Sequence, residues 1–260
     1  AEGSYEKRIA VEGHDEIAAL AERFNRMAEA ISEKIAELNE RAERQRLFIR
    51  GLSHEMRTPV TSIMARAETL LLRDISDIDR KRSLERIYDQ CAWLERFSGK
   101  LMTLTMLERN IEKKPESVAE LFDSVRETVS ASLEERGISL ISECRINTLP
   151  MDMDLMRSAI VNLIENARRA SSEGASIELN AVGNIIEVCD HGCGIPEDEI
   201  DRITEPFYMV DRSRSKKNGG IGLGLTIVKR IAQAHGASLE VYSASGEGTT
   251  ATLIFGDVDN

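Results

Sequence analysis

One histidine stands in a segment suited to nucleophilic chemistry. His54 lies in the run Ser53-His-Glu-Met-Arg-Thr-Pro59, where the carboxylate of Glu55 follows it directly. If Ile49 and Leu52 are core positions of a seven-residue helical repeat, His54 occupies the most exposed position of that repeat. An exposed imidazole is open to an incoming partner, and Glu55 can accept its Nδ1 proton so that Nε2 attacks. A lone exposed histidine is most often an ordinary surface residue, so this interpretation depends on the motifs elsewhere in the chain.

A second group of residues is suited to holding a metal-bound anion. Asn162 and Asn166 are four residues apart, so on a helix both amides project from one face. Asp190 follows an apolar run that is typical of a strand. Gly222 and Gly224 precede an amphipathic segment, and the first amides of a helix beginning there can hold phosphate.

The segment around His54 is predicted to lie on a long helix. Apolar residues step by three and four from Ile17 to Met27, then twice by four at Ile31 and Ile35, a discontinuity that locally unwinds a coiled coil. The pattern resumes as far as Met56, and we expect a copy of the chain to cover it, because so long a helix is not stable alone. Pro59 should bend the helix beside the histidine, since it lacks an N–H and its ring crowds the preceding turn.

A second helix is predicted from about residue 80 to residue 108, after the polar loop 73–77, with Asp77 or Asp79 as its N-cap. Two helices with a short connection form an antiparallel hairpin, and two hairpins form a dimeric four-helix bundle.

The pattern changes at Pro115, which we take as a domain boundary. Helices are predicted over 118–136, 154–170 and 222–235. Strands are predicted over 138–144, 176–181 and 185–189, and two more flank 246–248. This order predicts an α/β sandwich with helices on one face of a mixed sheet. The predicted domains are residues 1–32, 33–112 and 113–260.

Composition excludes several classes of protein. The 260 residues carry a net charge of −11, which argues against nucleic acid as a partner. No apolar run approaches the roughly 18 residues of a membrane span, and the first residue is Ala1 rather than Met, so we expect a fragment. The four cysteines are scattered, as in a reducing compartment. The run Cys189-Asp-His-Gly-Cys193 offers three metal ligands without a second pair, and a glycine turn is the favoured interpretation.

Six motifs in order resemble those of sensor histidine kinases. The segment around His54 resembles the phospho-acceptor motif of that family. Five further segments are similar to the five nucleotide-binding boxes of that family. They are Asn162–Arg169, Asp190–Pro196, Glu205–Tyr208, Gly219–Leu225 and Gly246–Thr250. Residues 13–27 resemble the second half of a HAMP linker, which in the family follows a transmembrane helix.

The resemblance implies a function and a set of site residues. The fold would be the helical hairpin followed by the ATP-binding domain of the Bergerat type. The activity would be Mg²⁺- and ATP-dependent phosphorylation of His54, followed by transfer to an aspartate of a response regulator. The implied catalytic residues are His54, Glu55 and Thr58, where Thr58 would orient water for dephosphorylation, and the implied Mg²⁺ ligand is Asn166. The implied nucleotide-binding residues are Asn162, Asn166, Arg169, Asp190, Gly192, Gly194, Ile195, Phe207, Gly220, Gly222, Leu223, Gly224, Leu225 and Thr250.

In this interpretation Asp190 accepts a hydrogen bond from the exocyclic amine of adenine. The chain would be a homodimeric cytoplasmic portion of a bacterial inner- or plasma-membrane protein, and it would meet the membrane only through N-terminal segments absent here. The basic segment 211–217 lies where the family has a lid over ATP, and a solvated loop is an equal alternative. Ala170 and Ile221 depart from the family pattern, which carries an aromatic residue and a threonine there.

Other functions compete with the kinase. The chain can instead be an ATP-sensing scaffold that acts mainly as a phosphatase of its response regulator. It can also be an ATPase of the wider superfamily, such as part of a chaperone or topoisomerase. That class lacks the His54 hairpin and carries a glutamate where this chain has Asn162. A P-loop is excluded because Leu225 stands where the catalytic lysine is required.

Overall fold

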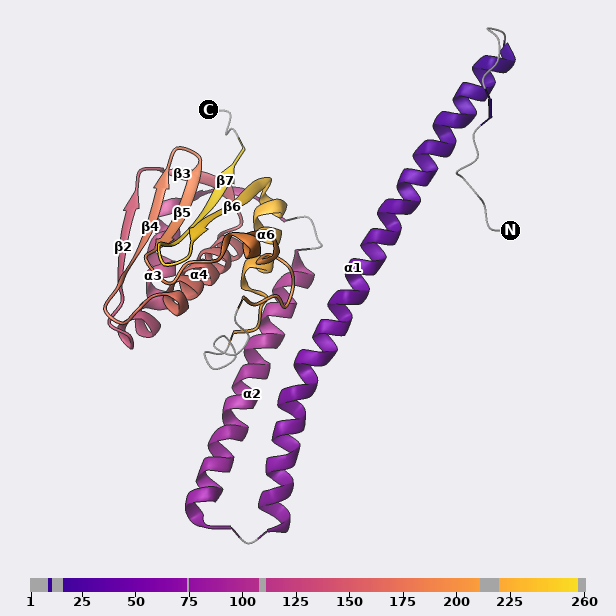
Figure 1. The fold of residues 1–260 in the computed structure, drawn as a ribbon. Coiled ribbons are helices and arrows are strands. Elements are labelled where there is room, and N and C mark those ends of the chain that lie inside the picture. The colour runs from indigo at the N-terminus through magenta and orange to yellow at the C-terminus, as the bar shows by residue number, and fades with distance from the viewer. Residues whose placement is uncertain (1–8, 11–15, 74, 108–110, 211–219, 257–260) are drawn as a thin grey trace. The chain divides into compact units, whose positions relative to one another are not determined.

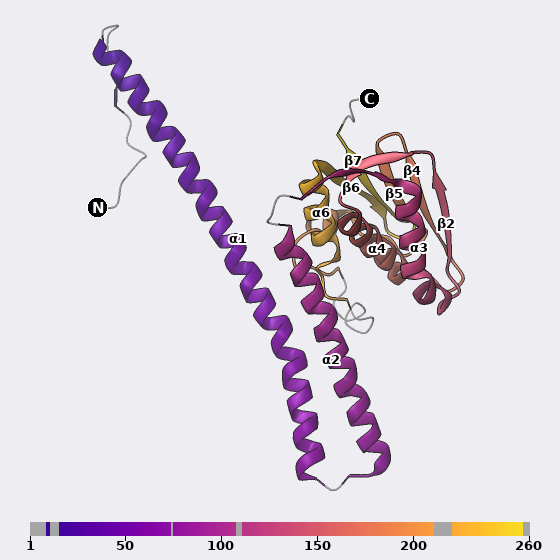
Figure 2. The same ribbon diagram turned by 180° about the vertical axis from the view of Figure 1, so that it is seen from behind.

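A computed structural model describes residues 9–10, 16–73, 75–107, 111–210 and 220–256 (Figures 1 and 2). The chain divides into two compact units, Ala1–Arg57 and Thr58–Asn260. Within the described residues, none of the helices combines the length and apolar character that a membrane span requires.

The first unit contains most of a single long helix, α1, which runs from Glu16 to Leu72. Most apolar residues of the predicted seam are exposed here, including Ile17 at 74%, Leu20 at 68% and Leu38 at 54%. A row of exposed apolar side chains along one helix is the surface that a partner helix covers, so pairing with a second copy stays a prediction.

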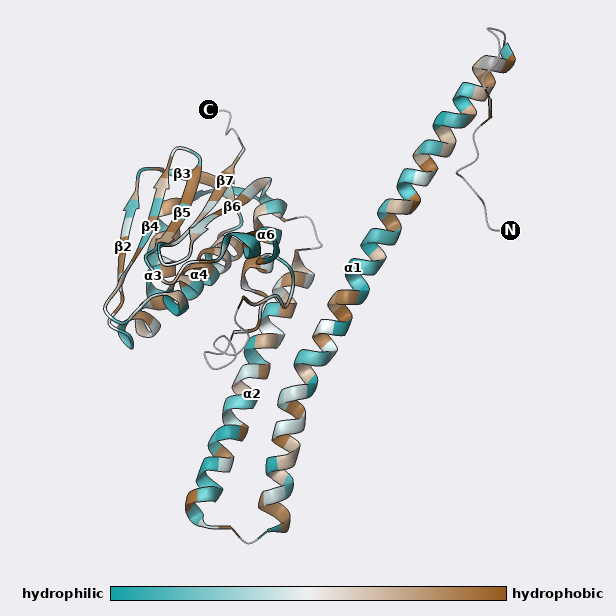
Figure 3. Ribbon diagram, in the orientation of Figure 1, coloured by the Kyte–Doolittle hydropathy of each residue, from teal (hydrophilic) through white to brown (hydrophobic). Residues whose placement is uncertain are grey.

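In the second unit the last part of α1 and helix α2, Asp77–Met106, form the predicted hairpin (Figures 1 and 2). The predicted N-cap was wrong, because the cap is Ser76, whose side chain accepts a hydrogen bond from the Asp79 N–H at 3.2 Å. Ser76 Oγ also donates to Asp79 Oδ2 at 2.7 Å, so the two side chains hold each other at the start of the helix. In Figure 3, apolar and polar residues recur along both helices with helical spacing.

The rest of the second unit is an α/β sandwich. Its five-stranded sheet has the order β2-β4-β5-β7-β6, in which only β2 and β4 pair in parallel. The strands are β2 (Ser139–Cys144), β4 (Ser176–Val182), β5 (Ile185–Asp190), β6 (Ala237–Ala244) and β7 (Gly248–Phe255). The strands β1 (Lys114–Ser117) and β3 (Thr148–Met151) pair antiparallel in a separate small sheet that the sequence pattern did not predict.

Three helices cover one face of the large sheet: α3 (Val118–Glu134), α4 (Met153–Ala170) and α6 (Gly224–His235) (Figure 1). Each is amphipathic, and alternate residues of β4 and β5 are buried beneath them. Fully buried Ile160, Leu179 and Ile227 belong to this core, which holds α4 and α6 against the sheet.

The start of α6 differs from the prediction. The helix begins at Gly224 rather than Gly222, because Gly222 has φ +71°, a left-handed conformation that an α-helix cannot contain. A short 3-10 helix, η1 (Glu197–Arg202), follows the glycine loop after β5 and was also not predicted.

Candidate active site

His54 lies on the long helix with its side chain open to solvent. The side chain is 69% exposed, whereas that of Glu55 is 16% exposed, and the Nδ1 of His54 lies 3.5 Å from the Glu55 Oε1. These residues are neighbours on the helix, and the Glu55 carboxylate lies on the Nδ1 side of the ring, so the attacking role falls to Nε2. The helix continues without interruption through Pro59 as far as Leu72, and the predicted bend stays a prediction.

A cavity of about 450 Å³ opens in the second unit between α4, α6 and the sheet. Its volume is within the range of small-molecule sites. Nine predicted nucleotide-binding residues line it: Asn166, Arg169, Asp190, Gly194, Ile195, Gly220, Gly222, Gly224 and Leu225.

Asp190 forms one end of the cavity. It is the last residue of β5 and is only 5% exposed, and its Oδ1 accepts a hydrogen bond from the Gly192 N–H at 2.8 Å. Burial raises the pKa of the Asp190 carboxyl, and hydrogen bonds from the backbone N–H groups of Gly192 and Thr249 partly oppose this. A buried carboxylate facing a cavity needs a donor there to compensate its desolvation.

The loop after Asp190 leaves no room for a side chain. A Cβ on Gly192 would lie 2.5 Å from the Ala170 carbonyl oxygen, at the end of α4. The N–H of Cys193 donates to that same oxygen at 3.2 Å, so the loop is tied to α4. Across the cavity a Cβ on Gly222 would lie 2.7 Å from the Phe207 carbonyl carbon, and the Phe207 N–H donates to the Gly222 carbonyl at 2.7 Å. Both loops therefore present backbone to the cavity.

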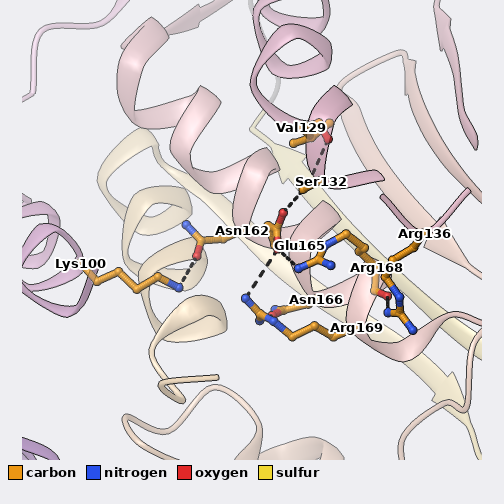
Figure 4. A network of polar contacts seen from close by, with 9 residues as sticks. All are labelled: Lys100, Val129, Ser132, Arg136, Asn162, Glu165, Asn166, Arg168 and Arg169. Carbon is orange, nitrogen blue, oxygen red and sulfur yellow. Dashed lines mark hydrogen bonds and ion pairs between the residues drawn. The ribbon is translucent and has the colours of Figure 1, made fainter. Parts of the chain in front are cut away.

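Amides and cations gather at the other end of the cavity (Figure 4). The Asn166 Oδ1 accepts a hydrogen bond from the Arg169 Nη1 at 3.1 Å. The first residue of α6 is close to both asparagines, because a Cβ on Gly224 would lie 3.4 Å from the Asn166 Oδ1 and 3.5 Å from the Asn162 Oδ1. The unsatisfied N–H groups at the start of α6 thus face the same place as the amides of α4.

Glu165 organises the arginines beside this end. Its Oε2 accepts from the Arg168 Nη2 at 2.9 Å, and its Oε1 accepts from the Ser132 hydroxyl at 2.9 Å. Burial opposes ionisation, but these two donors hold the pKa of Glu165 below its ordinary value. Its Oε2 is also 3.7 Å from the Arg169 Nη2, and Figure 4 shows Glu165 between the two arginines.

A lysine from α2 reaches the same end of the cavity. The Lys100 Nζ donates to the Asn162 Oδ1 at 3.0 Å, and Lys100 lines the cavity. Burial, followed by repulsion from Arg169, lowers the pKa of Lys100 to about 8. Burial also lowers the pKa of Arg169, whose Nε is buried with no hydrogen-bond partner among the described residues.

Some predicted residues do not line the cavity. Asn162 and Gly192 are hydrogen-bonded to the cavity residues Lys100 and Asp190, respectively. Leu223 is fully buried. Phe207 lies beside the cavity and has a backbone φ of 65°, which is rare for a residue other than glycine. The hydroxyl of Thr250 instead donates to the Cys189 Sγ at 3.3 Å.

Thr249 and Lys100 are polar residues of the cavity that the sequence analysis did not select as site residues. Thr249, rather than Thr250, lines the cavity, because successive residues of a strand point to opposite faces. The alternation of β7 could have indicated this choice if its register had been known. No sequence signal pointed to Lys100, which is 62 residues from its partner Asn162.

The side chains of the Cys189–Cys193 run have different surroundings. Cys193 lines the cavity, whereas the His191 Nε2 lies 3.4 Å from the Glu178 Oε1. Among the residues that the structure describes, no group of three or more His, Cys, Asp or Glu side chains is placed to hold a metal ion. The basic segment 211–217 and His14 lie outside the described residues.

Three family models match the chain. Residues 1–33 match the HAMP domain, 44–110 match the His Kinase A (phospho-acceptor) domain, and 151–258 match the histidine kinase-, DNA gyrase B- and HSP90-like ATPase. The chain is 30% identical over 212 residues to the sensor protein SrrB of Staphylococcus aureus, covering 78% of this chain and 36% of that protein. It therefore spans about a third of the length of that relative.

Solved structures show the same fold. The histidine kinase AdeS of Acinetobacter baumannii superposes with a TM-score of 0.57 at 19% identity, over 78% of this chain and 98% of that chain. The histidine kinase ThkA, solved in complex with the response regulator protein TrrA, superposes with a TM-score of 0.61 at 19% identity, over 85% of this chain and 62% of that chain.

Proposed function

This chain belongs to the sensor histidine kinases, and from that premise we propose that it transfers the γ-phosphoryl group of Mg·ATP to His54. The observation that carries the proposal is the cavity, which has a buried carboxylate at one end and amides, cations and a helix N-terminus at the other. Such a polarised cavity is complementary to a nucleotide with a neutral base and an anionic tail.

Adenine binds at Asp190 in this proposal. The Asp190 carboxylate accepts a hydrogen bond from the exocyclic amine, which supplies the donor that the buried group requires. Gly192 and Gly194 keep side chains away from the base, and Ile195 and Val188 contribute apolar surface.

The phosphates lie along α4 and the start of α6. Asn166 offers the amide oxygen that a hard cation prefers, and Mg²⁺, when bound, would neutralise phosphate charge there. Mg²⁺ at this oxygen would repel the Arg169 guanidinium that now donates to the Asn166 Oδ1, and the phosphates would offer the guanidinium new acceptors. The buried Nε of Arg169, which has no partner among the described residues, fits the same role.

The transfer step needs the imidazole of His54 in its neutral form. Its Nε2 attacks the γ-phosphorus, the bond to the bridging oxygen breaks, and ADP leaves with that oxygen. Glu55, whose Oε1 is 3.5 Å from the Nδ1, accepts the Nδ1 proton as positive charge develops on the ring. The transfer occurs within a homodimer whose seam is the exposed apolar row of α1.

The phosphoryl group then passes from His54 to an aspartate of a response regulator. This step follows from the family, and a structural relative was solved in complex with a response regulator protein. Thr58, an exposed residue four positions after His54 on α1, orients the water that removes phosphate from the regulator, so the chain is both kinase and phosphatase. The HAMP match supports a further part of the proposal, that the chain is the cytoplasmic portion of a membrane-anchored sensor.

The test is incubation of the chain with γ-labelled Mg·ATP. We expect label that is lost in acid and retained in base, as phosphohistidine behaves, and we expect His54→Gln to abolish it while nucleotide binding is unchanged. His235→Gln serves as the matched histidine control. Label that persists on the His54 variant would refute the assignment of the acceptor, and absence of nucleotide binding would refute the proposed site.

A further inference from the structure

Lys100 enters the nucleotide cavity from a helix outside the ATPase fold. It belongs to α2, whereas the other polar residues of the cavity come from the α/β sandwich. One turn before it on α2, Phe97 is 1% exposed, so this part of the helix is packed. Figure 4 shows the Lys100 side chain extended toward α4, where its Nζ donates to the Asn162 Oδ1 at 3.0 Å.

The position of Lys100 along α4 indicates which part of a nucleotide it meets. The end of α4 at Ala170 is bonded to the loop that follows Asp190, where the base is proposed to bind. Asn166 lies one turn back from that end and Asn162 lies two turns back, about 12 Å from Ala170 along the axis. Lys100 is therefore at the part of the cavity farthest from the base, where the last phosphate of a bound nucleotide reaches.

The charges around Lys100 are not balanced. Among the residues that the structure describes, the cations Arg169 and Arg96 repel its ammonium, and the carboxylate of Glu165 attracts it. Glu165 is already held by the Arg168 guanidinium through two hydrogen bonds, at 2.9 Å and 3.2 Å. The partner of Lys100 is a neutral amide, which compensates a buried ammonium poorly. This end of the cavity thus carries excess positive charge.

We propose that Lys100 is a nucleotide-binding residue, through which helix α2 contacts the terminal phosphate of ATP in the cavity. On binding, the ammonium exchanges the Asn162 Oδ1 for a phosphate oxygen, a charge-assisted bond in place of a neutral one. The four-carbon side chain of lysine and its three donors allow this exchange without movement of the backbone. The inference rests on the proposed ATP site, and its consequence is that α2, in the hairpin of the phospho-acceptor domain, distinguishes ATP from ADP.

The test compares nucleotides that differ in the last phosphate. Calorimetry would measure the binding of Mg·ADP and of Mg·adenylyl imidodiphosphate, an ATP analogue that is not hydrolysed. We expect Lys100→Met to weaken binding of the triphosphate analogue by about tenfold to a hundredfold. We expect the change for Mg·ADP to stay below about threefold and Lys100→Arg to retain most of the triphosphate affinity.

Matched variants separate binding from folding. Lys81→Met removes an exposed lysine of the same helix, 81% exposed and 4.0 Å from Glu85, and should change neither affinity. Lys100→Gln keeps a donor for Asn162 without the charge and should behave as Lys100→Met, which covers the case in which methionine disturbs the helix.

The inference is overturned if Lys100→Met weakens the binding of Mg·ADP and of the triphosphate analogue equally. It is also overturned if neither Lys100→Met nor Lys100→Gln weakens binding of the triphosphate analogue. Tighter triphosphate binding by Lys100→Met also overturns it, since Lys100 would then compete with the nucleotide for Asn162. In each of these cases the parent chain still binds ATP, so the proposed function stands. A parent chain that binds no nucleotide refutes both.

Discussion

Replacing Asp190 by asparagine would keep the size of a buried side chain and remove its charge. The Oδ1 of Asp190 already accepts the Gly192 N–H at 2.8 Å, and the remaining oxygen is the acceptor proposed for the adenine amine. In the variant, the amide oxygen is needed for the backbone N–H groups of Gly192 and Thr249, so its NH₂ group faces the cavity. Two donors, the NH₂ group and the adenine amine, then face each other without an acceptor.

The expected loss follows from the burial of this residue. A hydrogen bond to a charged group contributes about 1.5–3 kcal/mol, and every 1.4 kcal/mol is about tenfold in affinity. Because Asp190 is only 5% exposed, water cannot replace the lost acceptor. Binding of Mg·ATP should therefore weaken by about ten- to 150-fold.

The assay is calorimetric titration with Mg·ATP and Mg·ITP, whose base carries an oxygen in place of the amine. The parent chain should bind ATP far more tightly than ITP, whereas Asp190→Asn should lose affinity for ATP and bind ITP at least as well as the parent. Asp123→Asn, which changes an exposed aspartate on α3, is the matched control and should leave both affinities unchanged.

Stability provides an independent check on the same variant. Burial raises the pKa of Asp190, so its carboxyl binds a proton more tightly in the nucleotide-free folded chain than in the unfolded chain. The stabilisation from the protonated carboxyl is present below the ordinary pKa and is lost as the pH rises through the raised value. At neutral pH the nucleotide-free Asp190→Asn variant should thus melt no lower than the parent. Unchanged ATP affinity of Asp190→Asn would refute the placement of adenine at Asp190. A much lower melting temperature would mean that any loss of ATP affinity comes from misfolding.

Three further predictions concern other parts of the chain. Thr58→Ala should still label His54 in γ-labelled Mg·ATP, but it should dephosphorylate its response regulator poorly; equal loss of both activities contradicts a separate role for Thr58. Burial lowers the pKa of His235, whose neutral Nε2 accepts the Asp152 N–H at 3.0 Å, so the free energy of unfolding should fall as the pH drops below about 6.5. In denaturant titrations, His235→Gln should reduce the pH dependence of the free energy of unfolding, and an unaltered dependence would contradict this role of His235. Single-residue insertions or deletions within 33–42 shift the seam and should make autophosphorylation rise and fall with heptad phase, whereas activity indifferent to phase makes the segment a passive tether.

The histidine site could be predicted almost entirely from local sequence. A helix of period 3.6 determines that His54 is exposed and that Glu55 lies beside it, and the structure gives both. The same reasoning placed Asn162 and Asn166 on one face of α4, where Gly224 lies close to both. The order of the motifs indicated the family by resemblance, and the pattern of predicted helices and strands indicated the fold class.

Contacts between distant segments could not be predicted in this way. The pairing of Lys114 with Met151 creates a small sheet from segments without strong alternation. The choice of Ser76 rather than Asp77 as the cap of α2 depended on where the extended backbone ended. Whether Thr249 or Thr250 faces the cavity depended on the register of β7 against β5, which pairs Asp190 with Thr249.

The sequence by itself predicted on which helix, strand or loop most of the candidate residues lie, since helical and strand patterns repeat over a few residues. The tertiary structure alone decided which cations share the cavity. Arg169 reaches Asn166 within one helix, but Lys100 reaches Asn162 across 62 residues, and no periodic pattern links them. Their contact arises from the packing of α2 in the second unit, in which Phe97, one turn before Lys100, is buried.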